Sequence, residues 1–267
     1  MDAHNIEILK DMFNWITISD VSENEIFRMA EKLEYELDDN FLFKCTWSYY
    51  RKCTVFSLNK VPLLFLKYVR EHYVEEILAL HMTKYFLDPD LCFEKYLTGF
   101  LEKKKKTIPF IMTTYEMGDN IGRYDIQEFK YLLGKQCYLH EILCLYDVYE
   151  RHFIVRNRDS MCRIDFGRAF ENLQREYLGF SDFLKKIKID YNDLEFQSGY
   201  QKEREIIKKN LESKENDLLN IIQKVKEMEE DYDLPMFHPK KFCARLIEYW
   251  ERIGFLREMN ITEPLPF

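Results

Sequence analysis

The chain has 267 residues, of which 46% are hydrophobic, so it carries enough apolar side chains to bury a core. Only 8 of the 267 residues are glycine. This is about 3% of the chain, against a usual share of ~7%, and it excludes collagen-like and glycine-rich low-complexity classes. The formal net charge of −8 removes the overall attraction on which a non-specific nucleic-acid binder depends.

The first part of the chain, residues 1–40, predicts an N-terminal helical extension. Apolar residues recur at helical spacing over 5–18 and predict one amphipathic helix. Ser22 and Glu25 have the spacing of a capping box, in which each side chain satisfies a backbone N–H of the other residue. A second helix is therefore expected over 22–37.

A region of strands follows and contains one helix. Short β-type segments separated by polar turns predict a three-stranded antiparallel meander over Phe41–Trp47, Cys53–Leu58 and Val61–Val69. Helical spacing then predicts a helix over Glu71–Phe86. Two more strands are expected over Cys92–Phe100 and Ile108–Tyr115, with a charged tip at Glu102–Lys106 between them. The lysines of this tip fit either a solvated hairpin end or an anion-binding patch.

The remaining residues predict a mainly helical region with one small hairpin. The expected elements are a helix over Asp125–Tyr146, strands over His152–Arg156 and Met161–Ile164, and helices over 171–186, 200–231 and 239–258. The charged segment Gln201–Glu230 has the composition of a coiled coil, but its apolar positions do not keep a strict heptad. A helix that packs through a single apolar stripe is the favoured interpretation.

The sequence carries no signal for secretion or for membrane insertion. No stretch approaches the ~18 uninterrupted apolar residues of a membrane helix, and acidic residues near the start do not fit a signal peptide. The 7 cysteines form no Cys-x-x-Cys pair, which argues against a zinc ribbon. We therefore expect a cytoplasmic protein with reduced thiols and no membrane span.

The sharpest motif is Arg163-Ile164-Asp165-Phe166-Gly167, which follows a predicted buried strand. Asp147 lies eighteen residues before Asp165, just ahead of another strand, and His152 comes five residues after Asp147. Together with the order of elements, this pattern resembles the protein-kinase-like superfamily, in its atypical branch of small-molecule and lipid kinases. The resemblance implies an α+β, bilobal fold with a small sheet lobe at 41–117 and a mainly helical lobe at 118–267.

The resemblance also implies roles for the residues of this motif. Asp165 would hold Mg²⁺ between the phosphates of ATP, and Asp147 would orient and deprotonate the acceptor hydroxyl. Arg151 or Arg168 would stabilise charge on the transferring group. His152 stands where the family pattern has a metal-binding asparagine, so a metal role for His152 departs from that pattern because Mg²⁺ prefers oxygen ligands.

Upstream residues complete the implied ATP site. Lys67, in Leu64-Phe65-Leu66-Lys67, resembles the strand lysine that contacts the α- and β-phosphates, with Glu75 or Glu76 as its acidic partner. The segment from Phe110 to Gly118 resembles the strand and hinge that bind adenine. In it Thr113 would be the gatekeeper, and the cofactor-binding hinge residues would be Thr114, Tyr115, Glu116 and Met117.

The first hairpin departs from the family because it lacks a glycine-rich loop. Its turn instead contains Ser48, Arg51 and Lys52, whose hydroxyl and cationic groups would either hold phosphates or form an ordinary turn over a degenerate site. Few residues separate Gly167 from the next predicted helix, so a phosphoregulated loop is not expected.

The function implied is an ATP-dependent phosphotransferase that uses ATP and Mg²⁺ and modifies a hydroxyl of a small molecule, lipid or protein. The alternative is a pseudokinase scaffold that binds nucleotide or a protein partner without catalysis, because the glycine loop is missing and His152 replaces asparagine. A third possibility is transfer of a nucleotide onto a protein by the same site. Carboxylates beyond Phe170 favour a cationic or neutral acceptor over nucleic acid.

Overall fold

The computed structural model divides the chain into two compact units, Met1–Tyr73 with Phe93–Glu116, and Val74–Cys92 with Met117–Phe267. The chain therefore passes between the units three times. The structure describes residues 19–20, 41–47, 52–58, 61–69, 72–86, 88, 91, 93, 96–103, 106–174, 179–210 and 239–258. The predicted helices at 5–18 and 22–37 lie outside these residues, as does Ser48.

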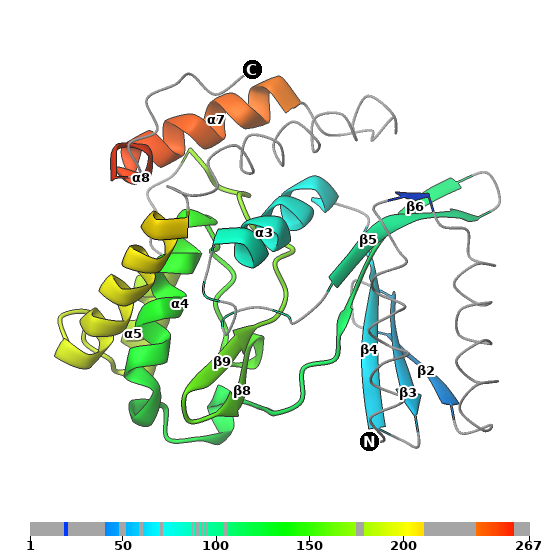
Figure 1. The fold of residues 1–267 in the computed structure, drawn as a ribbon, viewed down its shortest axis with the longest axis horizontal. Helices are drawn as coiled ribbons and strands as arrows, with labels where there is room; N and C mark the ends of the chain where they lie inside the picture. The colour runs from blue at the N-terminus through cyan, green and yellow to red at the C-terminus, as the bar shows by residue number, and fades with distance from the viewer. Residues whose placement is uncertain are drawn as a thin grey trace. The chain divides into compact units, whose positions relative to one another are not determined.

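The first unit contains a six-stranded sheet with the order β1-β5-β6-β4-β3-β2 (Figure 1). Its strands are β1 (Ser19–Asp20), β2 (Phe41–Trp47), β3 (Lys52–Leu58), β4 (Val61–Tyr68), β5 (Tyr96–Lys103) and β6 (Lys106–Thr114). All neighbours are antiparallel except β1 and β5, which are parallel. The predicted meander of β2, β3 and β4 is confirmed.

The β5–β6 hairpin extends further toward its tip than the sequence predicts. Pairing runs from Tyr96 opposite Thr113 to Lys103 opposite Lys106, so both of these lysines belong to strands. Each added pair in such a ladder satisfies backbone hydrogen-bonding groups, which favours continuing the strands toward the turn. Lys67 lies on β4 opposite Ile111 of β6 and is buried.

The second unit combines helices with a small antiparallel sheet of order β7-β8-β9. Its helices are α3 (Tyr73–Phe86), which begins at the last residue of the first unit, α4 (Lys130–Ile142), α5 (Gly179–Ile187), α7 (Pro239–Arg252) and α8 (Phe255–Glu258). Its strands are β7 (Asp119–Asn120), β8 (Phe153–Asn157) and β9 (Ser160–Arg163), and residues 194–210 form a further helical segment. The chain is therefore α+β, as predicted.

Helix α4 is shorter than the predicted helix over Asp125–Tyr146. A 3₁₀ helix, Ile126–Phe129, precedes it, and after Ile142 the backbone leaves helical geometry, with Cys144 at φ 49°. Carbonyl groups at this end that lack a partner within the helix accept hydrogen bonds from α7: the indole of Trp250 donates to the carbonyl of Ile142 at 3.0 Å. A tertiary contact thus satisfies groups that every helix end leaves open.

The helix predicted over 171–186 is wrong at 171–174. Residues 167–174 form turns, and α5 begins only at Gly179. The N–H of Phe170, which has φ 58°, donates to the carbonyl of Leu143 at 2.9 Å. This segment therefore satisfies its backbone against the end of α4 rather than within a helix of its own.

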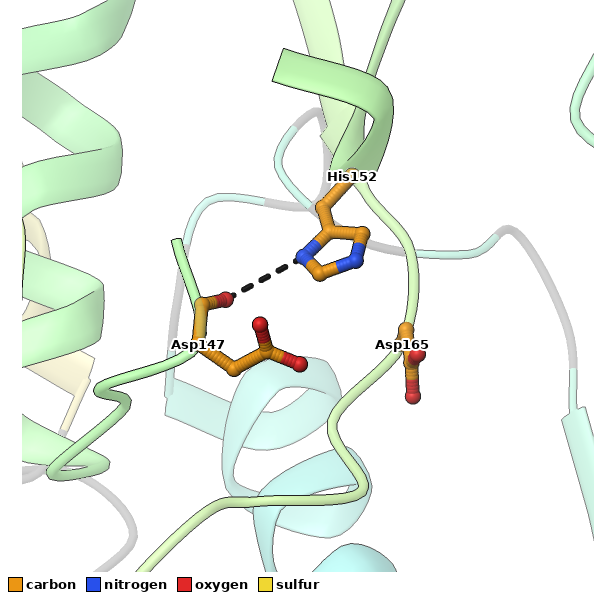
Figure 2. Close-up of side chains that lie close together, drawn as sticks. All are labelled: Asp147, His152 and Asp165. Atoms are coloured by element: carbon orange, nitrogen blue, oxygen red, sulfur yellow. Dashed lines mark hydrogen bonds between the residues drawn. The ribbon is translucent and has the colours of Figure 1, made fainter. Parts of the chain in front are cut away.

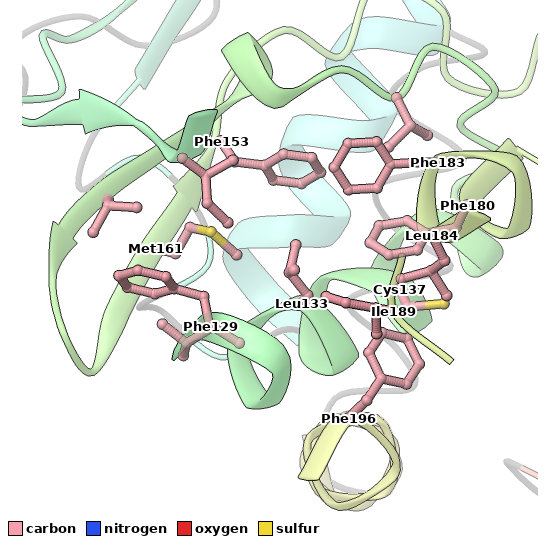
Figure 3. Packing of buried hydrophobic residues seen from close by; sticks show 14 residues of the cluster. Phe129, Leu133, Cys137, Phe153, Met161, Phe180, Phe183, Leu184, Ile189 and Phe196 are labelled. Atoms are coloured by element: carbon pink, nitrogen blue, oxygen red, sulfur yellow. The ribbon is translucent and has the colours of Figure 1, made fainter. Parts of the chain in front are cut away.

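The core of the second unit surrounds α4 and the β8–β9 hairpin (Figure 3). Side chains from several elements meet there, including Leu133 and Cys137 of α4, Phe153 of β8, Met161 of β9, and Phe180 and Phe183 of α5. Burying a large apolar side chain contributes about 1.5–3 kcal/mol. This packing holds α4 and the hairpin, and hence the loops that leave them, in one arrangement.

Helix α4 also packs very closely on the helical segment 194–210. A Cβ atom added at Gly134 would lie 2.0 Å from the carbonyl oxygen of Phe196, and one added at Gly199 would lie 1.9 Å from that of Tyr131. Real Cβ atoms do not approach this closely, so only glycine fits at both positions. Among the described residues, no helix is long and apolar enough to span a membrane.

Candidate functional site

Three chemically active side chains of the second unit meet beside the β8–β9 hairpin (Figure 2). Asp147, His152 and Asp165 each offer one potential ligand atom, and these atoms all lie within 4.8 Å of one another. His152 is buried, Asp147 is half-buried and Asp165 is exposed. The structure thus brings together the three residues on which the kinase resemblance depended.

Local backbone bonds explain how residues eighteen positions apart become neighbours. The chain leaves α4, passes Asp147 and enters a short 3₁₀ helix, Glu150–His152, which leads into β8. In the hairpin, Phe153 pairs with Arg163, and the N–H of Ile164 donates to the carbonyl of His152 at 2.9 Å. Asp165, one residue further, therefore lies beside His152.

The two ring nitrogens of His152 have different roles. Nδ1 lies 3.1 Å from the carbonyl oxygen of Asp147, the contact drawn in Figure 2. Because that oxygen only accepts hydrogen bonds, Nδ1 carries the proton and Nε2 keeps its lone pair. The Nε–H of Arg151 donates to Nε2 at 3.3 Å, which agrees with this tautomer.

His152 is neutral at physiological pH. Its pKa is lowered to about 4, mainly by burial and also by the nearby Arg163, while Asp147 and Asp165 oppose this shift. A neutral imidazole with a free lone pair is the form in which histidine binds metal ions.

Arg163 joins the two chain segments that carry Asp147 and Asp165. This residue of β9 is completely buried, and one guanidinium nitrogen donates to the carbonyl of Asp147 at 2.9 Å and to that of Asp165 at 2.8 Å. The guanidinium also lies 5.6 Å from the ring centre of Phe153. Sequence reasoning treated Arg163 only as part of the motif, although an arginine in a buried strand was a signal of such a role.

Asp165 has an uncommon backbone conformation for a residue other than glycine. Its φ is 68°, and its Oδ1 accepts a hydrogen bond from the N–H of Gly167 at 3.2 Å. Left-handed geometry costs such a residue about 1–2 kcal/mol. The adjacent Phe166, only 1% exposed, anchors the turn and helps to maintain this conformation.

The predicted phosphate-binding residues belong to two different units. Lys67 is a buried residue of β4 in the first unit. Glu75 and Glu76 lie in the first turn of α3 in the second unit, where Glu76 is buried and Glu75 is partly exposed. The pairing of Lys67 with one of these glutamates stays a prediction.

The predicted hinge coincides with a boundary between the units, which falls between Glu116 and Met117. Thr113 is buried at the end of β6, and the hydroxyl of Thr114 donates to a carboxylate oxygen of Glu116 at 3.5 Å. Tyr115 and Met117 are exposed, so the hinge has apolar side chains at its surface.

Gly118 follows the hinge and cannot be replaced without strain. Its φ is 151°, and an added Cβ would lie 2.3 Å from the carbonyl oxygen of Val155. Arg168, the other candidate cation, forms an exposed ion pair with Glu171 at 3.6 Å. Of the two candidate arginines, Arg151 donates a hydrogen bond to a residue of the cluster, His152.

A scan against known protein families gave no match, and neither did a search of curated proteins. Function is therefore inferred from the chain's own residues and their geometry.

Proposed function

We propose that the chain is an ATP-dependent phosphotransferase with a bilobal, protein-kinase-like fold, whose lobes are residues 41–117 and 118–267. These bounds differ from those of the two compact units, which group Val74–Cys92 with the mainly helical part. The observation that carries the proposal is the meeting of Asp147, His152 and Asp165 within 4.8 Å at the base of a hairpin. Phosphoryl transfer requires a metal-binding carboxylate and a second carboxylate for the acceptor hydroxyl in such proximity.

The donor atoms of the cluster suit a divalent cation. Asp165 contributes an exposed carboxylate, and His152 contributes a neutral nitrogen. These two residues would hold the metal, which when bound would neutralise negative charge on the β- and γ-phosphates. In the proposal the metal is Mg²⁺ or a related divalent ion.

Each remaining residue has a role in positioning or proton transfer. Asp147 accepts the proton of the acceptor hydroxyl, and Arg151 stabilises negative charge on the transferring group. Lys67 contacts the α- and β-phosphates, with Glu75 or Glu76 orienting its ammonium group. Backbone groups from Thr114 to Met117 bind adenine.

Two substitutions test the proposal. Asp147→Asn and Asp165→Asn change each carboxylate into a neutral amide of nearly the same size, so the fold should persist while ATP turnover falls by at least 10²-fold. Turnover is measured as release of ADP in the presence of divalent metal and candidate acceptors, and Asp159→Asn in the exposed β8–β9 turn is the matched control. Wild-type turnover in both cluster variants would exclude the proposed mechanism.

A non-catalytic pseudokinase is the second candidate, and the contact between Arg151 and Nε2 of His152 favours it, because a guanidinium occupies the atom that would bind metal. Thermal melting with ATP separates the two functions. Stabilisation by ATP that requires divalent metal supports the phosphotransferase, whereas stabilisation by ATP alone supports the scaffold. Transfer of a nucleotide would instead appear as a larger mass added to an acceptor protein.

A further inference from the structure

The cluster of Asp147, His152 and Asp165 offers two carboxylate oxygens and one imidazole nitrogen. Mg²⁺ demands oxygen ligands in near-ideal octahedral geometry, whereas imidazole is a good ligand for divalent first-row transition metals. We propose that this cluster selects a divalent transition metal, in the series from Mn²⁺ to Zn²⁺, over Mg²⁺. The inference deepens the proposed function, on which it rests for its role, because it names the metal class of the same site.

The imidazole is held ready to coordinate. Its Nδ1–H donates to the carbonyl of Asp147 at 3.1 Å, which leaves Nε2 as the ring nitrogen with a lone pair for a metal ion. Metal-binding histidines usually donate their second N–H to such an acceptor, which fixes the ring and its tautomer. Asp147 thus provides a carbonyl to the ring and a carboxylate to the cluster.

The backbone is held in place at both residues that carry the carboxylates, Asp147 and Asp165. Arg163 donates to the carbonyls of Asp147 and Asp165 at 2.9 and 2.8 Å, and it is completely buried. The residues that carry the oxygen donors are therefore joined through one side chain. With the backbones of these two residues held in place, the type of the ligand atoms contributes to the choice of metal, and one of the three atoms is a nitrogen.

One contact must change when a metal binds. The Nε–H of Arg151 donates to Nε2 of His152 at 3.3 Å, and the guanidinium lies 4.5 Å from the ring centre of Tyr149. Arg151 is exposed, so its side chain can move into solvent while the ring of His152 stays in place. The metal would then be coordinated by Nε2 of His152, the atom that Arg151 now contacts.

The test uses the full chain without nucleotide and Mn²⁺ as the probe. Electron paramagnetic resonance counts free Mn²⁺ in a titration, and Mg²⁺ is added as competitor. Pulsed measurements on the bound ion detect a directly coordinated ¹⁴N nucleus, which reports imidazole ligation without any substitution. The expected result is one site that binds Mn²⁺ at least about tenfold more tightly than Mg²⁺, with a ¹⁴N signal.

His152→Asn replaces the nitrogen donor with an amide oxygen. The ¹⁴N signal should disappear, and the preference for Mn²⁺ over Mg²⁺ should fall by about tenfold because Mn²⁺ loses its nitrogen ligand. Asp159→Asn, which removes a carboxylate from the exposed turn of the same hairpin, should leave both properties unchanged.

Equal affinities of the wild-type chain for Mn²⁺ and Mg²⁺, or bound Mn²⁺ without a ¹⁴N signal, would overturn the inference. The wild-type result stands even if the variant does not fold. The outcome is also separate from the proposed function: ATP turnover by a chain that binds both metals with equal affinity would refute the selectivity alone. Selective metal binding without turnover would refute phosphotransfer alone.

Discussion

Arg163 connects the candidate site to the core, because its buried guanidinium holds the backbone carbonyls on both sides of the cluster. Arg163→Met keeps the apolar stem but removes both hydrogen bonds. Each buried carbonyl left without a donor costs about 1–3 kcal/mol, so unfolding in urea should occur at lower denaturant concentration.

The affinity for Mn²⁺ should fall at least tenfold in the same variant, since the two carboxylates lose their common anchor. Arg163→Lys, which keeps the charge but has a single nitrogen on a flexible stem, should recover only part of either property. A folded Arg163→Met chain that binds Mn²⁺ as the wild type does would show that Arg163 has no positioning role.

Glu203 makes stability depend on pH. Burial raises its pKa to about 7, although it accepts a hydrogen bond from the N–H of Asp88 and lies 3.8 Å from the ammonium of Lys135. The folded chain therefore holds this proton more tightly than the unfolded chain. The stability that Glu203 contributes is present below its unfolded pKa of about 4.5 and is lost as the pH rises through 7.

Glu203→Gln removes this titration. Relative to the wild type, the variant should become more stable as the pH rises from 5 to 8, with a slope of at most ~1.4 kcal/mol per pH unit. Urea unfolding of both proteins across this pH range measures the difference. A difference that does not change with pH would contradict the raised pKa.

At the scale of elements, the end of α4 and the start of the β8–β9 hairpin determine where the site lies. Their positions depend in turn on the close contact between α4 and the helical segment 194–210. Gly→Ala in the middle of an exposed helix usually stabilises by about 0.5–1 kcal/mol. Gly134→Ala should instead destabilise, by about 1–3 kcal/mol, because its Cβ would lie 2.0 Å from the carbonyl oxygen of Phe196.

Gly122→Ala is the matched control for this substitution. Its added Cβ would meet the end of the Glu150 side chain at 2.6 Å, and that side chain can move away. Thermal melting should therefore separate the two variants, with only Gly134→Ala lowering the melting temperature by several degrees. Similar melting temperatures for both would show that the helices separate easily to accommodate a methyl group.

The sequence predicted elements well where their signal is local. Alternating and helical patterns located the meander and the β8–β9 hairpin to within a residue or two. The pattern failed at 171–174, where the chain forms turns, and just before these residues the N–H of Phe170 donates to the carbonyl of Leu143 in a distant part of the chain. Periodicity within one segment contains no information about such a contact.

The candidate site was predictable to a similar extent. Motif spacing identified Asp147, His152 and Asp165, and the structure places their ligand atoms together. Motif spacing did not identify the role of Arg163, because that role depends on two backbone carbonyls that only the folded hairpin brings into reach. The partner of Lys67 likewise depends on long-range placement, which spacing alone does not supply.

At the scale of the whole molecule, the proposal requires the sheet unit and the mainly helical unit to act on one nucleotide. Lys67 belongs to the first unit and the cluster of Asp147, His152 and Asp165 to the second. A nucleotide with phosphates at the cluster and adenine at Thr114 to Met117 would engage residues of both.

A crystal structure of the chain with a non-hydrolysable ATP analogue and Mn²⁺ tests this central claim most directly. The expected result is a metal ion bound by Asp165 and by Nε2 of His152, in contact with the analogue's phosphates, with Lys67 at the α- and β-phosphates. A nucleotide bound elsewhere, or a cluster that holds no metal in the presence of the analogue, would contradict the proposed phosphotransferase.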